Sequence, residues 1–156
     1  MRLIFCLNFF FLLHSFSGHL DVAKFLINSG IETDLVGISS WTPLHLAVFK
    51  NHIDIVKYLI DHGKANIDAK DDEGWNPLLM AVSNSDIELV KYLINCGAQV
   101  ENSFNNQNQT LIHVAADKGK IEIVKFLIEN GAVVDAKCNL DCTPLFLAAQ
   151  KGIMNL

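Results

Sequence analysis

One pattern of apolar and polar residues recurs along this chain in a constant frame, and it restricts the possible folds more than any other feature. The segments that begin at Trp41, Trp75 and Gln109 align without a gap. Each segment ends at a glycine, and the glycines at positions 63, 97 and 131 are spaced by 34 residues. Self-similarity at a period of roughly 20 to 50 residues indicates a stack of equivalent structural units.

Incomplete copies flank the three complete ones. The segment GHLDVAKFLINSG ends at Gly30, 33 residues before Gly63, and CTPLFLAAQKG begins at Cys142. Both 34-residue spacings contain one additional residue, near Lys64 and within 105–108, and we expect longer loops there. The frame divides the chain into an apolar leader (1–17), a partial repeat (18–38), three repeats (39–71, 72–105 and 106–138) and a truncated repeat (139–156).

Each complete copy contains the signals of two short helices. In the first copy, Thr42 is a helix-capping residue and Pro43 suits the first helical position, so an inner helix should begin there. A polar break precedes a second helix over 53–61, because Ile53, Val56, Leu59 and Ile60 share one helical face. We expect Gly63 to end this helix in the left-handed conformation. A polar, turn-rich loop follows in each copy.

These motifs resemble the ankyrin repeat, with its TPLH start, GH break, IVKxLI helix and following GA. The resemblance covers 18–156 and implies an all-α solenoid of stacked antiparallel helix hairpins with β-hairpin or loop fingers. It also implies a concave surface for partners. Four positions depart from the family pattern: Asn76 for threonine, Leu79 and Phe146 for histidine, and Leu111 for proline.

The leader MRLIFCLNFFFLLHSFS differs in composition from the rest of the chain. Counting back along the frame, an inner helix should start near Phe9, so the leader stands where that helix belongs. Three interpretations remain open: a divergent or non-native first helix, a cleaved signal peptide, and a membrane anchor. We favour the first, because cleavage after Ser17 would leave a second helix without its packing partner. We expect low local order in 1–16, or a helix laid over the first repeat.

The composition and motifs argue against several kinds of chemistry. The formal charge is −5 and Arg2 is the one arginine, so the chain lacks a basic footprint for nucleic acid. The four cysteines form no metal-ligand pattern, and a reduced intracellular location, cytoplasmic or nuclear, is the simpler interpretation. The resemblance implies that His45 and His113 bond neighbouring turns. We expect no catalytic residue, no metal and no cofactor.

Aromatic residues at family groove positions are the main functional signal. The resemblance places Trp41 and Trp75 at the bases of fingers and Phe49 on the inner surface, where large aromatics are typical binding hot spots. A competing interpretation is that each indole packs sideways on the neighbouring finger. The candidate partner-binding residues are Trp41, Phe49, Lys50, Asp72, Glu73, Trp75, Ser83, Asn84, Gln107, Gln109, Asp117 and Lys118.

These observations favour a non-catalytic module that binds a protein partner through fingers and inner helices. Two other classes remain open. One is the ankyrin arm of a membrane-associated channel or of a secreted toxin similar to the latrotoxins, with the leader as targeting segment. The other is the regulatory arm of a larger enzyme. The scaffold alone does not identify the partner, because specificity lies in the variable surface residues.

Overall fold

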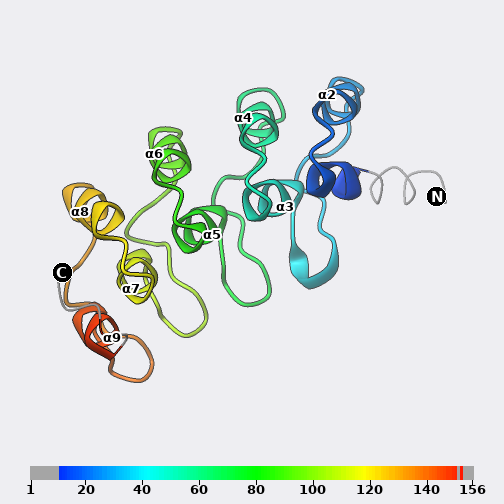
Figure 1. Ribbon diagram of the computed structural model, residues 1–156. Coiled ribbons are helices and arrows are strands. Elements are labelled where there is room, and N and C mark those ends of the chain that lie inside the picture. Colours follow the sequence, from blue (N-terminus) through cyan, green and yellow to red (C-terminus); the bar gives the residue numbers. More distant parts are fainter. Residues whose placement is uncertain (1–10, 151, 153–156) are drawn as a thin grey trace.

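The chain folds into a row of helix pairs, and the computed structural model describes residues 11–150 and 152 of it (Figure 1). Residues 11–17 are helical as well. The row bends so that the loops between pairs, the fingers, lie on the inner side of the curve (Figure 1). The elements after the first helix are α2 (Leu20–Asn28), η1 (Ile38–Ser40), α3 (Pro43–Phe49), α4 (Ile53–Asp61), α5 (Pro77–Asn84), α6 (Ile87–Asn95), α7 (Leu111–Asp117), α8 (Ile121–Glu129) and α9 (Pro144–Gln150).

The helices form two layers, which confirms the all-α solenoid. The inner helices α3, α5, α7 and α9 contact one another in chain order, and each of α3, α5 and α7 packs on the outer helix that follows it. Over the described residues the fingers are loops with one isolated antiparallel bridge, between Phe104 and Thr110, and they form no regular β-hairpin. No helix in this part of the chain is long and apolar enough to cross a membrane.

The inner helices begin where the sequence places capping residues. The Thr42 side chain accepts a hydrogen bond from the amide of His45, and the Asn76 side chain does the same for Leu79. Pro43 and Pro77 fill the following position, which needs no amide donor. Asn76 therefore replaces threonine without loss of the cap.

The core is a set of layers between consecutive hairpins. Equivalent positions of the inner helices are fully buried, as at Ala47, Ala81 and Ala115, where the small side chain lets adjacent helices approach closely. The outer helices add their apolar face to the same core. Its fully or almost fully buried members are Ala23, Ile55, Val56, Leu59, Leu89, Val90, Leu93, Ile123 and Leu127. Burial of each large aliphatic side chain stabilises the fold by about 1.5–3 kcal/mol.

A buried histidine joins neighbouring repeats through the backbone. Nδ1 of His45 accepts a hydrogen bond from the Thr42 amide at 3.2 Å, and its Nε2 lies 3.1 Å from the carbonyl oxygen of Trp75, one repeat further on. His113 makes the same link to the carbonyl oxygen of Cys142 at 3.0 Å. Burial lowers the pKa of His45, against the opposing effects of the Trp75 carbonyl and Asp71. His45 is thus a neutral structural residue that donates through Nε2.

The middle repeat lacks the histidine link to the repeat that follows it. Leu79 stands at the histidine position and is fully buried but cannot hydrogen bond. Within this repeat, the Asn76 side-chain amide donates to the hydroxyl of Ser103 at 2.7 Å, and that hydroxyl donates to the carbonyl oxygen of Gln99 at 2.5 Å. Both side chains are almost completely buried, so the repeat satisfies these polar groups internally.

The end of the leader packs as the inner helix of the first hairpin. Phe11 is fully buried within the common apolar core, and Leu12 packs against that core. Nε2 of His52 lies 2.9 Å from the carbonyl oxygen of Phe16, which ties this helix to the start of α4. Residues 1–10 lie outside the described residues, so the choice between divergent helix, signal peptide and anchor stays a prediction.

The structure corrects the expected end of α4. Gly63 does not have a positive φ, and the left-handed residue is Lys64, with φ 54°. In the next two repeats the glycine itself is left-handed, with φ 98° at Gly97 and 90° at Gly131. The additional residue between Gly63 and Ala65 moves the turn by one position. Gly63 is instead required by space, because an added Cβ would lie 2.7 Å from the carbonyl oxygen of Leu59.

A second left-handed position ends each inner helix. It is occupied by Gly18, Asn51, Ser85, Gly119 and Gly152, with φ between 58° and 79°. Glycine and asparagine adopt this conformation readily, whereas serine is strained there. Ser85 is therefore the weakest residue in this set.

We predict that Ser85→Gly stabilises the protein by about 0.5–1 kcal/mol, because relief of the left-handed strain exceeds the entropic cost of glycine. Thermal unfolding followed by circular dichroism should show a transition a few degrees higher. The reciprocal change Gly119→Ser, at the equivalent position with φ 65°, should lower it. Shifts of the same sign in both variants would contradict this account.

The lowered pKa of His45 predicts a specific acid sensitivity. Below about pH 6.5 the unfolded chain binds a proton at this histidine, whereas the folded chain binds it only at lower pH. The contribution of neutral His45 to the free energy of unfolding is therefore complete above about pH 6.5 and is lost as the pH falls. We expect the free energy of unfolding of His45→Leu to fall less steeply between pH 7 and 5. The difference in slope from the unsubstituted protein should reach up to about 1.4 kcal/mol per pH unit. Denaturant unfolding at several pH values measures this slope.

Leucine is the matched replacement for His45, because Leu79 occupies the equivalent position in the next repeat. All other titrating groups are common to both proteins, so the difference between the two slopes isolates His45. Equal slopes in the two proteins would show that His45 does not contribute to acid unfolding.

Candidate binding surface

Three adjoining hollows run along the inner-helix and finger side of the row. The first, of about 540 Å³, lies between the helix at 11–17 and the finger that precedes α5. The second, of about 190 Å³, shares Trp41, Asp71 and Glu73 with the first. The third, of about 330 Å³, shares Trp75 and Ser83 with the second. Because consecutive hollows share walls, they form one discontinuous groove across four hairpins.

The structure brings most of the predicted surface residues together along this groove. The members that line the second or third hollow are Trp41, Phe49, Glu73, Trp75, Ser83, Asn84, Gln109, Asp117 and Lys118. The other three predicted residues, Lys50, Asp72 and Gln107, do not line these hollows. The positions that the ankyrin resemblance placed on the groove side thus lie mostly along one surface.

The three residues outside the hollows have local contacts. The carboxylate of Asp72 accepts a hydrogen bond from the hydroxyl of Ser40 at 2.5 Å, and the carbonyl oxygen of Gln107 accepts one from the amide of Asn139 at 2.9 Å. Both therefore hold adjacent fingers together. Lys50 places its Nζ 4.2 Å from the centre of the Phe16 ring and 5.5 Å from that of Phe49, as cation–π contacts at the edge of the groove.

The side chain of Trp41 packs within the protein. Its indole Nε1 donates to Oδ2 of Asp71 at 3.0 Å. Its ring meets that of Phe49 edge-on, with centroids 5.1 Å apart and planes at 63°. These contacts support sideways packing of Trp41 on the next finger, and they fix its remaining exposed surface as a rigid wall of the groove.

Asp71 is a groove residue that the sequence interpretation missed. Its Oδ1 accepts hydrogen bonds from the amides of Glu73 at 2.9 Å and Trp75 at 2.8 Å, which fixes the finger turn. An aspartate shortly before a glycine-containing turn is a known local signal for this arrangement. The leader side chains Leu12, Leu13 and Phe16 were also missed, because the repeat pattern does not extend into them.

Trp75 differs from Trp41 in one respect. It is half-buried and packs against the core, but among the described residues its indole N–H has no acceptor. The residue one repeat after Asp71 is Asn105, whose Oδ1 accepts the amides of Gln107 and Gln109 and whose amide group donates to the Gln109 side chain. Trp75 lines the second and third hollows, and its indole donor is unpaired among the described residues.

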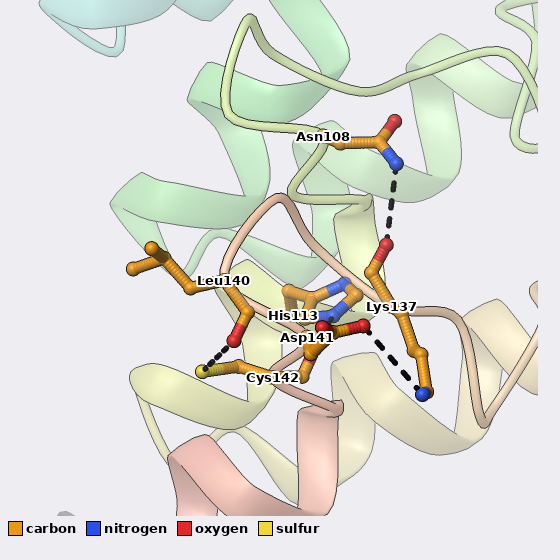
Figure 2. Close-up of polar contacts among 6 residues, drawn as sticks. All are labelled: Asn108, His113, Lys137, Leu140, Asp141 and Cys142. Atoms are coloured by element: carbon orange, nitrogen blue, oxygen red, sulfur yellow. Dashed lines mark hydrogen bonds and ion pairs between the residues drawn. The ribbon is translucent and has the colours of Figure 1, made fainter.

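Lys137, Asp141 and Cys142 lie in the last finger, and the contacts drawn there hold the finger in place (Figure 2). Asn108 donates to the carbonyl oxygen of Lys137 at 3.2 Å, and Lys137 lies 3.6 Å from Asp141. Burial raises the pKa of the Cys142 thiol, and the neighbouring Cys138 and Asp141 act in the same direction. A raised pKa keeps a thiol protonated, which is opposite to the requirement of a cysteine nucleophile. The described residues contain no group of three potential metal ligands.

Comparison with known proteins agrees with this architecture. The family model for ankyrin repeats, in three copies, matches residues 11–104 and 100–156. The first match begins inside the apolar leader and includes the helix at 11–17. A search of curated proteins finds no match. The family match covers most of the sequence, and the chain belongs to the ankyrin-repeat family.

Proposed function

We propose that this chain is a non-catalytic adaptor that binds a protein partner along its inner-helix and finger surface. Ankyrin repeats are in general protein-interaction modules. The observation that carries the proposal is the convergence of nine predicted surface residues, from separate repeats, on one line of hollows. A cytoplasmic or nuclear location is part of this proposal and rests on the cysteine pattern of the sequence.

The groove has the features of a protein-binding surface. Its walls are aromatic and aliphatic, with Trp41, Phe49, Trp75 and Met80 around the second hollow, and polar side chains such as Asn84 lie at its edge. Asn84 is itself anchored, because its amide donates to the carbonyl oxygen of Val48 at 2.9 Å. A rigid surface loses little side-chain entropy on binding, so less of the free energy gained from its contacts is offset by ordering.

The proposal can be tested by site-specific photo-crosslinking. A photoreactive phenylalanine analogue at Phe49 should capture a partner from cell extract, because Phe49 is 48% exposed and lines the groove. The matched control is the same analogue at Phe25, which is 70% exposed on the outer helix α2. A protein captured at position 49 and not at position 25 is then identified by mass spectrometry and purified.

Affinity for that purified protein provides the decisive measurement. We predict that Trp75→Ala weakens binding by about 2 kcal/mol, roughly 30-fold in Kd, because it removes an aromatic anchor from the centre of the groove. Phe25→Ala should leave Kd unchanged. Equal capture at positions 49 and 25, or an unchanged Kd for Trp75→Ala in a folded protein, would contradict the assignment of this surface.

A further inference from the structure

We propose that the first two hollows together select a peptide segment of a partner protein in which an arginine adjoins a bulky apolar side chain. This inference rests on the proposed function and specifies the chemistry of the partner. It derives from three features of the groove: a continuous apolar wall, a local excess of carboxylates, and an aromatic surface beside an unpaired carboxylate.

The apolar part of the site is the larger hollow. Its wall joins Leu12, Leu13 and Phe16 of the first helix to Leu46 of α3 and to the ring of Trp41. Phe16 is 38% exposed and Leu13 is 43% exposed, so their surface is available within the hollow. A cavity of about 540 Å³ is large enough for a branched or aromatic side chain together with its neighbours.

Negative charge gathers where the two hollows meet. Asp71, Asp72 and Glu73 are consecutive, and Asp71 and Glu73 line both hollows. The oxygens of Asp71 accept hydrogen bonds from two amides and the Trp41 indole. Lys50 does not line either hollow, and its Nζ lies over the Phe16 and Phe49 rings.

Glu73 is the carboxylate that can meet a ligand. Its side chain is exposed and has no hydrogen bond or ion pair with any described residue. Its backbone is held in place, because its amide donates to Asp71 and its carbonyl oxygen accepts from the amide of Asn106 at 2.9 Å. A fixed backbone with a free carboxylate suits recognition of a cation.

Arginine fits this position better than lysine. Trp41, Trp75 and Glu73 line the second hollow together, and a guanidinium group can stack on an indole while it pairs with a carboxylate. The adjacent apolar hollow then accepts the neighbouring side chain of the same segment. The one arginine of this chain, Arg2, adjoins Leu3, so binding of a second copy is treated as a separate outcome of the test.

The test is selection from a random dodecapeptide library displayed on phage, with the full chain immobilised. We expect enriched peptides to carry arginine within two positions of leucine, phenylalanine or tryptophan. Binding of the synthesised peptides should weaken about tenfold with Glu73→Gln, which removes one charge-assisted contact. It should also weaken when salt is raised, since exposed charges are screened.

Two control proteins make the result specific. Glu122→Gln removes an exposed carboxylate from the outer helix α8 and should leave peptide affinity unchanged. Glu73→Lys reverses the charge within the groove, and a repeated selection should enrich aspartate or glutamate in place of arginine. Circular dichroism establishes that each variant remains folded.

The possible failures separate the two proposals. Enriched peptides without a basic preference, whose binding is lost in Trp75→Ala but unchanged in Glu73→Gln, would overturn the arginine inference and leave the groove as the binding surface. Peptides insensitive to both substitutions, or no enrichment, would count against both proposals. Self-association of the chain, measured by sedimentation and abolished by Glu73→Lys, would identify a second copy as the occupant and overturn the inference.

Discussion

The contact between consecutive hairpins is the interaction on which the rest of this structure depends. One hairpin has two short helices and cannot enclose an apolar core, so its buried side chains become buried only against the next hairpin. The fully buried alanines of the inner helices set the closeness of that contact. The polar groups trapped at the junction must then bond within it, and His45 and His113 do so through the carbonyl of the following repeat.

The middle repeat shows that a junction can form without the histidine link. Leu79 contributes apolar burial where histidine would hydrogen bond, and the buried pair of Asn76 and Ser103 satisfies its polar groups within the repeat. The fingers add a second line of contacts, because the amides of Asp72, Asn106 and Asn139 each donate to a carbonyl oxygen of the preceding finger. Each repeat is thus fixed to its neighbours along two separate edges, which orients the groove between them.

The helix pairs could be predicted because their signals are local: capping residues, proline at the first turn and apolar periodicity act within a few residues of one another. Counting back along the frame also predicted an inner helix near Phe9, and residues 11–17 form a helix whose Phe11 is fully buried, although no local motif marks it. The end of the outer helix α4 depends on a finer cause. Lys64 adopts the left-handed conformation expected at Gly63. The frame showed that this loop has one additional residue, but it did not show which residue would have the positive φ.

The groove was predictable in outline for a related reason. The resemblance to the ankyrin repeat places recurring positions on one surface, and the equivalent residues Phe49, Ser83 and Asp117 line the second and third hollows although they belong to separate repeats. The period says nothing about which polar groups remain free. Trp41 and Trp75 are equivalent in the frame, yet Asp71 accepts the indole proton of Trp41, whereas Asn105 turns its amide toward Gln109 and offers Trp75 no acceptor. The exchange of aspartate for asparagine at this position therefore gives the two tryptophans different roles. Trp41 is bonded to the next finger, whereas the indole N–H of Trp75 can donate to a ligand. Differences of this kind between equivalent positions give a repeat array its specificity.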